Sequence, residues 1–457
     1  IVDLVIWNED SSVYRDSLGE RITGLIAAAT EGKTGQKGSI FLRRSDQMSE
    51  EDRILIQTVA RVIISDRGGT LAEQLKDMTQ PKVNPLPFVP TRREDPGENG
   101  PEIGERSDLT FFNGLGGFTG DGREYVITTS RAKRTPAPWV NVLANPNFGT
   151  VISESGNAYT WSENAHEFRL TPWKNDPVTD ASGEAFYIRD EETGRFWSPT
   201  PLPASGKTRY VSRHGFGYSV FEHLESGIFS ELTVFVSLEN SIKFSILKIR
   251  NLSGRRRNLS AAAYCDLVLG TFRDKYHMHI VTEVDPKSGA LLARNPYNKE
   301  FPGRVVFLDV NEPTRFVSGD RIEFIGRNGT LESPSAMYRD RLSGKVGAGI
   351  DPCVAAQVKF EIGEGQEKEI LFTLGSGKTL DEARELLRRF GGLDSARREL
   401  ETVWEYWKRT LGVVYAETPD LSTNFLVNGW LQYQVMSCRL WGRSGYYQSG
   451  GAFGFRD

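Results

Sequence analysis

Cysteine is scarce in this 457-residue chain: Cys265, Cys353 and Cys438 are the only three, and they lie far apart. An odd number of widely spaced cysteines argues against a framework of disulfide bonds. It fits a protein of a reducing compartment, and we expect the cytoplasm. The sequence therefore predicts a chain that is held together by packed cores rather than by covalent cross-links.

Long apolar runs and an excess of charge of one sign are also missing. The longest apolar candidates, such as Leu232–Val236, have the length of a strand, whereas a membrane-spanning helix needs about 20 apolar residues. The net charge is −4, and basic and acidic residues are mixed along the chain. The sequence therefore predicts no positive electrostatic field that would favour binding to nucleic acid. The one basic cluster, Arg255–Arg257, is interpreted as a solvated hairpin turn. We expect neither a membrane span nor a nucleic-acid partner.

Motifs for metals, nucleotides and covalent nucleophiles are weak. On a strand, His277 and His279 would share one face as a metal pair, but no third ligand is near in the sequence. Gly375–Thr379 ends like a phosphate-binding loop, yet Phe372 stands where that motif needs glycine. His214 has two open interpretations, contact with a sugar or phosphate and a buried structural role. The sequence thus predicts no metal and no cofactor.

The length of the chain suggests two or three domains. Residues 1–80 show helical apolar spacing, including a helix that Ser49 caps and whose apolar stripe runs from Ile54 to Ile63. Residues 81–107 are rich in proline and charge and are expected to form a linker. The chain starts without Met and stops inside what resembles a motif, which suggests a piece of a longer polypeptide.

From residue 108 to residue 374 the pattern has a period of two, with Glu124–Thr129 and Ile242–Ile249 as examples. Many such strands without alternating helices favour one large antiparallel β-sandwich of two layers. Residues 375–415 have helical spacing in two stretches, of which Thr379 caps the first. A further helix is expected over Phe425–Cys438, in a domain that begins at residue 416.

Aromatic residues are concentrated between residues 111 and 222. At the centre of this block is a predicted hairpin that carries Tyr187, Phe196 and Trp197 around the turn Asp190–Gly194. Flat rings beside polar side chains suit a sugar, which has an apolar face and a rim of hydroxyls. The same rings suit the core of a sandwich, and we favour that interpretation.

The segment Trp161–Ser198 resembles the signature of glycoside hydrolase family 94, the inverting phosphorylases of β-linked glucosides, and in particular the version found in cyclic β-1,2-glucan synthases. Phe111–Phe118, Thr135–Pro146, Asn428–Gln434 and Tyr447–Asp457 also resemble these proteins. The resemblance implies a mainly β fold with α: a small α-rich N-terminal segment, an antiparallel β-super-sandwich, a helical linker and the start of an (α/α) barrel of six helical hairpins.

The resemblance also implies binding residues. Arg456 and Asp457 match the family's Arg-Asp pair, which holds the glucosyl unit on the nonreducing side of the cleaved bond, and Tyr447, Gln448 and Phe455 are expected to shape the same pocket. The proton donor and the phosphate-binding residues are expected later in the barrel. No catalytic residue is therefore assigned to this chain, and inorganic phosphate is expected as the co-substrate of the parent enzyme.

Two functional hypotheses follow. In the first, the chain is the N-terminal part of a phosphorylase-type module that either cleaves β-1,2-glucan with phosphate and inversion or adjusts the length of a growing glucan. Its partners would be a β-glucan oligosaccharide, the rest of a larger polypeptide and, by analogy, a second copy. Its parent could be an inner-membrane protein with this part on the cytoplasmic side. In the second, the chain is a non-catalytic carbohydrate-binding or assembly module.

Overall fold

The computed structural model describes residues 3–9, 17–30, 38–77, 103–104 and 106–450. The contacts divide the chain into two compact units, Ile1–Asn84 and Pro85–Asp457. The finer domain boundaries that the sequence suggests, at residues 107, 374 and 415, stay predictions.

The first unit combines a small parallel sheet with helices. Its elements are β1 (Leu4–Asn8), α1 (Ser17–Thr30), β2 (Ile40–Arg44), the 3-10 helix η1 (Ser45–Gln47), α2 (Glu50–Val59) and α3 (Leu71–Asp77). Ser49 caps α2 as predicted, because its hydroxyl accepts a hydrogen bond from the Asp52 N–H. The predicted stripe is too long, since the helix ends at Val59. Ile54 and Leu55 are more than half exposed, so neither is part of a core among the described residues.

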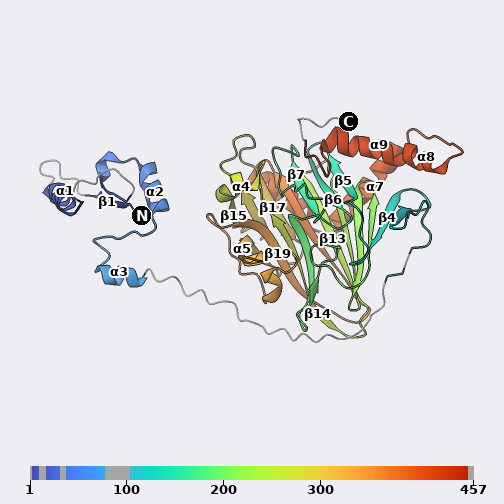
Figure 1. Ribbon diagram of the computed structural model, residues 1–457, viewed down its shortest axis with the longest axis horizontal. Helices are drawn as coiled ribbons and strands as arrows, with labels where there is room; N and C mark the ends of the chain where they lie inside the picture. The colour runs from blue at the N-terminus through green and yellow to red at the C-terminus, as the bar shows by residue number, and fades with distance from the viewer. Residues whose placement is uncertain (1–2, 10–16, 31–37, 78–102, 105, 451–457) are drawn as a thin grey trace. The chain divides into compact units, whose positions relative to one another are not determined.

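Three antiparallel sheets make up the β-rich body of the second unit (Figure 1). The large sheet has ten strands in the order β15-β16-β17-β20-β13-β12-β11-β10-β4-β3, the second has five in the order β18-β19-β14-β8-β9, and the third has three in the order β5-β6-β7. The predicted antiparallel β-body is confirmed. The strand bounds are β3 Gly116–Phe118, β4 Glu124–Thr129, β5 Val140–Asn145, β6 Phe148–Ser153, β7 Ala158–Ser162, β8 Glu184–Asp190, β9 Phe196–Trp197, β10 Tyr210–Gly215, β11 Tyr218–Glu225, β12 Ile228–Val236, β13 Ile242–Asn251, β14 Arg257–Asp266, β15 Val281–Val284, β16 Leu291–Arg294, β17 Val305–Val310, β18 Phe316–Asp320, β19 Pro352–Ile362 and β20 Glu367–Gly377.

The large sheet packs against the two smaller sheets on one face and against helices on the other. The core between the sheets contains Phe148, Phe221, Leu259 and Val306, which are fully buried apolar side chains. On the opposite face, α6 (Leu380–Phe390) and α7 (Leu393–Leu411) cover β17 and β20. Because both faces of the large sheet are covered, its strands alternate less clearly between apolar and polar residues than a half-exposed sheet would.

One buried ion pair joins all three sheets. The Lys243 ammonium on β13 pairs with the Glu184 carboxylate on β8, and the two side chains are 4% and 3% exposed. Lys243 also donates to the Thr160 hydroxyl on β7 at 2.9 Å, and Thr160 and Thr171 donate to Glu184 at 2.6 and 2.8 Å. The carboxylate therefore has a hydrogen-bonded partner from each layer that surrounds it.

The C-terminal helix is one continuous run of helical residues in which two α-helical segments alternate with two wider π-helical turns. It consists of α8 (Leu421–Phe425), the π-helical turn η4 (Leu426–Trp430), α9 (Leu431–Gln434) and the π-helical turn η5 (Val435–Gly442). The predicted helix is confirmed, and its observed bounds are wider than those expected from the sequence. The helix lies at the end of the sandwich where β5 and β7 are labelled in Figure 1.

The central aromatic rings belong to the core, as the favoured interpretation expects. Tyr187 is fully buried, and Trp161 and Trp197 are 2% exposed. The predicted hairpin is present, because β8 and β9 pair antiparallel around a turn in which Gly194 has a φ of 70°.

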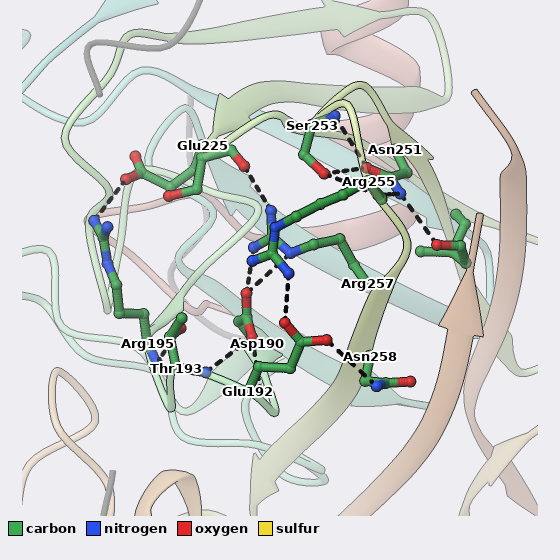
Figure 2. A network of polar contacts seen from close by, with 12 residues as sticks. Asp190, Glu192, Thr193, Arg195, Glu225, Asn251, Ser253, Arg255, Arg257 and Asn258 are labelled. Atoms are coloured by element: carbon green, nitrogen blue, oxygen red, sulfur yellow. Dashed lines mark hydrogen bonds and ion pairs between the residues drawn. The ribbon is translucent and has the colours of Figure 1, made fainter. Parts of the chain in front are cut away.

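The strand that a metal pair of His277 and His279 would require is not formed, and the prediction for Arg255–Arg257 is wrong. His277–His279 form a 3-10 turn, η2, directly after the short helix α4 (Arg273–Tyr276), rather than a strand. The cluster Arg255–Arg257 is not fully solvated: Arg257 is 5% exposed, and its Nε donates to the Asp190 carboxylate at 3.0 Å. Figure 2 shows this pair, with Arg255 reaching Glu192 from the same turn. A buried guanidinium is tolerated here because a carboxylate lies opposite it.

His214 has the structural role. It is 4% exposed, and its ring nitrogens lie 2.9 Å from the Ser219 hydroxyl and 3.1 Å from the Trp139 carbonyl oxygen. Burial lowers the pKa of His214 to about 4, so the imidazole is neutral at physiological pH. Gly375–Gly377 continue β20, and Thr379 caps α6.

No helix in the described part of the chain combines the length and the apolar composition that crossing a membrane requires. Within the same residues, no group of three or more His, Cys, Asp or Glu side chains is placed to hold a metal ion.

Candidate functional site

The predicted sugar-binding residues fall partly within the described structure. Tyr447 and Gln448 are described and lie on the surface, and the Tyr447 side chain is 55% exposed. Phe455, Arg456 and Asp457 lie outside the described residues. The structure therefore shows how the segment before the Arg-Asp pair is positioned, and the roles of all five residues stay predictions.

The segment Ser444–Gly450 turns sharply away from the C-terminal helix. Arg443 ends the helix in a left-handed conformation with a φ of 45°. Directly after it, the Ser444 N–H donates to the Cys438 carbonyl at 3.2 Å, and the Gly445 N–H donates to the Gln448 carbonyl at 2.8 Å. The second bond closes a tight turn, which places Tyr447 on the outside.

Tyr446 anchors this turn to the sandwich. Its side chain is 7% exposed, and its hydroxyl lies 2.9 Å from both the Asp180 carboxylate and the Asp176 carbonyl oxygen. Its own carbonyl accepts a hydrogen bond of 2.8 Å from the Trp173 indole. Burial and the nearby Asp180 charge raise the pKa of Tyr446, so the hydroxyl stays a donor. Tyr446 is fixed, and Tyr447 beside it points to solvent.

Two further side chains of the sandwich hold the same segment. The Tyr159 hydroxyl bonds the Ser444 hydroxyl, and the Arg169 guanidinium donates to the Ser449 hydroxyl. Arg169 is 3% exposed, and it also donates to the Thr271 carbonyl at 2.9 Å. The segment is thus attached on both sides of its turn, by residues more than 260 positions earlier in the chain.

Sequence reasoning missed these anchors. Tyr159, Arg169 and Trp173 lie in the aromatic block between residues 111 and 222, but nothing local in the sequence links them to Tyr446 or Ser449. The only available signal was that the aromatic block and the C-terminal segment both resemble one family, which is compatible with the two lying together.

Glu154 lies beside this anchor, in a small pocket that Asp180 also lines. Glu154 is 4% exposed. The carboxylate accepts hydrogen bonds from the Thr135 hydroxyl and from the Trp139 N–H, the second at 2.8 Å. Burial is the main cause that raises the pKa of Glu154 to about 7. The folded state therefore holds this proton more tightly than the unfolded state does. The resulting contribution to stability is complete below the ordinary carboxyl pKa and is lost as the pH rises through about 7.

Replacing Glu154 with glutamine is expected to stabilise the protein at pH 8 by up to ~3 kcal/mol and to leave its stability at pH 5 nearly unchanged. The amide keeps the acceptor for Trp139 and carries no charge. Urea unfolding at both pH values measures the difference, with the exposed Glu332→Gln as the control. An equal effect of Glu154→Gln at the two pH values would contradict the assignment.

Family models match the sequence in two places. The supersandwich domain of glycosyl hydrolase 94 matches residues 123–392, and the catalytic domain of the glycosyl hydrolase 94 superfamily matches residues 406–457. The first match covers β4 to β20 and α6, and the second covers the C-terminal helix and the anchored segment.

Curated relatives agree with this. The chain is 33% identical over its whole length to the cyclic beta-(1,2)-glucan synthase NdvB of Rhizobium meliloti (strain 1021), and it spans 16% of that protein. It is 26% identical to the N,N'-diacetylchitobiose phosphorylase of Vibrio furnissii over 75% of the chain and 43% of that protein. The chain thus spans well under two thirds of the length of these relatives.

Among solved structures, a bacterial glucoamylase complexed with acarbose aligns with a TM-score of 0.41 and 10% identity, over 69% of this chain and 44% of that one. The assignment of the family rests on the sequence matches, since the supersandwich model alone covers more than half of the chain. By these sequence matches, the chain belongs to glycosyl hydrolase family 94, as a carbohydrate-active module.

Proposed function

We propose that the chain is the N-terminal part of a β-glucan-active phosphorylase-type module, which either cleaves β-1,2-glucan with phosphate and inversion or controls chain length in cyclic β-1,2-glucan synthesis. The observation that carries the proposal is the 33% identity to a cyclic beta-(1,2)-glucan synthase along the entire chain, including the first unit. The phosphorylases align with 75% of the chain or less, which favours the synthase context.

The C-terminal helix supports the proposal that a helical catalytic domain builds on this sandwich. One face of the helix is buried against the sandwich through Trp430 and Tyr433. The other face is also apolar, because five side chains that point away from the sandwich are 42–62% exposed. These are Leu421, Leu426, Leu431, Val435 and Leu440. A helix that is apolar on both faces is typical of a buried helix, and further helices of an (α/α) barrel would cover it.

The chemistry of the proposed site follows from the side chains. An inverting phosphorylase needs one acid to protonate the leaving oxygen, because phosphate is itself the nucleophile. Arg456 would donate from a planar fork and Asp457 would accept, so together they can hold neighbouring sugar hydroxyls. The anchored turn would present Tyr447 and Gln448 beside them. The acid and the phosphate-binding residues would come from later parts of the barrel.

Glucan binding tests the site. Linear β-1,2-glucan titrated into the chain is expected to bind, and Arg456→Ala is expected to weaken that binding about tenfold or more, since hydrogen bonds to a charged group contribute ~1.5–3 kcal/mol each. The exposed Arg327→Ala is the matched control and should bind as the wild type does. Binding that is unaffected by Arg456→Ala would favour a non-catalytic carbohydrate-binding module instead.

A phosphorolysis assay tests the assignment of the proton donor to a later segment. Incubated with β-1,2-glucan and inorganic phosphate, the 457-residue chain is expected to release no glucose 1-phosphate, because the proton donor is assigned to a later segment. A chromatographic assay for the sugar phosphate measures this. Release that depends on phosphate would place the acid within this chain and overturn the assignment.

A further inference from the structure

A groove at the end of the sandwich lies beside the anchored segment Ser444–Gly450, because Arg169 and Trp173 belong to both. Its volume is about 380 Å³, and loops that follow β7 and β14 and the first residue of α5 (Arg321–Ile325) form its walls. The lining side chains include Arg169, Trp173, Lys174, Phe272 and Arg273. The volume is in the range of sites for small organic ligands, roughly 300–1,000 Å³, and exceeds what a bare inorganic anion needs.

The basic side chains of the groove divide into two groups. Arg273 and Arg321 are committed to carboxylates, since both pair with Asp266 and with Asp351. Arg169 and Lys174 have no carboxylate partner among the described residues, and the carboxylate that remains on the lining is the exposed Asp274. Among the described lining residues, Arg169 and Lys174 therefore face one further carboxylate, Asp274, and the groove keeps an excess of positive charge.

The Arg169 guanidinium is held in a fixed orientation. Arg169 is 3% exposed, and its hydrogen bonds to two carbonyl oxygens and to the Ser449 hydroxyl fix the plane of the guanidinium. One N–H on each terminal nitrogen stays without a described partner. The hydrogen bonds of Arg169 go to neutral groups, so its guanidinium has no hydrogen-bonded carboxylate among the described residues, and an oxyanion in the groove could take that place.

Aromatic rings flank the same guanidinium. Its central carbon lies 5.3 Å from the centre of the Trp173 ring and 5.6 Å from the centre of the Phe272 ring. Phe272 is 58% exposed, so its ring can be reached from solvent. An exposed ring next to a cationic centre provides the apolar surface that the flat face of a sugar ring requires.

We propose that this groove binds an acidic monosaccharide unit, with its oxyanion on Arg169 and Lys174 and its ring against Phe272. The oxyanion can be a carboxylate or a phosphate ester, since both match the guanidinium fork. Tyr447 and Gln448, the described residues of the predicted glucan site, do not line the groove, and the proposed ligand is an acidic sugar rather than a neutral glucan.

Calorimetric titration at constant ionic strength tests the proposal with glucuronate, glucose 6-phosphate and neutral glucose. At least one acidic sugar should bind with a dissociation constant of about 1 mM or lower, and glucose should bind at least tenfold more weakly. Tighter binding of glucuronate identifies a carboxylate ligand, and tighter binding of glucose 6-phosphate identifies a phosphate ester. No heat of binding from either acid at ~20 mM, or equal affinity for glucose, would overturn the proposal.

Two exposed substitutions locate the site without disturbing the core. Lys174→Glu and Phe272→Ala should each weaken the binding of the acidic sugar at least fivefold. Lys287→Glu is the control, because Lys287 is exposed, lies outside the groove and gives the same change of net charge as Lys174→Glu. The affinity of this control should stay within twofold of the wild type. Melting temperatures confirm that all three variants are folded. If Lys174→Glu and Lys287→Glu weaken binding equally, the effect is one of overall charge, and the groove is not the site.

Discussion

Lys243→Ala is expected to lower the free energy of unfolding by about 3–5 kcal/mol, because it leaves the Glu184 carboxylate buried without its counter-charge. The substitution affects all three sheets at once, since Lys243 lies on β13, Glu184 on β8 and Thr160, one of the two threonines that still donate to Glu184, on β7. Guanidinium unfolding, followed by tryptophan fluorescence and by circular dichroism, measures the loss. The two signals should move together, since the ion pair lies in the shared core.

Lys248→Ala is the matched control for this experiment. Lys248 lies on the same strand and pairs with Glu367 at 3.0 Å, but its side chain is 34% exposed and that of Glu367 is 43% exposed. Solvent screens such a pair, so its loss should cost less than about 1 kcal/mol. If Lys243→Ala costs no more than Lys248→Ala, the buried pair does not stabilise the junction of the sheets.

Tyr433→Ala is expected to cost about 3–5 kcal/mol and to act mainly on the C-terminal helix. The Tyr433 ring is 1% exposed and lies 4.6 Å from that of Trp407. Its hydroxyl accepts from the Gly217 N–H at 3.0 Å and lies 2.9 Å from the Asn141 side-chain oxygen. Truncation removes apolar contacts and leaves these polar partners unsatisfied.

Hydrogen exchange distinguishes local from global loss in this variant. Amides of residues 421–442 should exchange faster, while those of β14 stay protected, because the helix rests on the sandwich through few side chains. Leu431→Ala is the control, since Leu431 lies in the same turn of helix and is 49% exposed; it should change stability by less than about 0.5 kcal/mol. Equal exchange in the two variants would contradict the anchoring role of Tyr433.

Elements with strong local signals were predicted well from the sequence. Gly391 and Gly392 separate two amphipathic stretches, and the structure ends α6 at Phe390 and begins α7 at Leu393. The alternation in Glu124–Thr129 gives β4 with the same bounds. Capping side chains, glycines and periodicity act over a few residues, so they can be read without knowledge of the rest of the chain.

Features that depend on distant partners were not predictable. Arg257 resembles a solvated arginine because its neighbours are charged, but Asp190, which pairs with it, stands 67 positions away. Likewise, Asp180 and Tyr446 are separated by 266 positions. Whether a polar side chain is buried depends on the partner that tertiary folding brings to it, and a single sequence does not name that partner.

The two widened turns of the C-terminal helix affect how this segment can vary. Each π-helical turn holds more residues than an α-helical turn, so the positions of Tyr433 and Trp441 against the sandwich depend on the number of residues in η4 and η5. Deleting one residue from Leu426–Trp430 can convert the π-helical turn into an α-helical one, which keeps the residues after it close to their original orientation around the helix axis. A single-residue deletion should therefore be better tolerated in Leu426–Trp430 than in the regular helix α7, where it would rotate all later residues by about 100°.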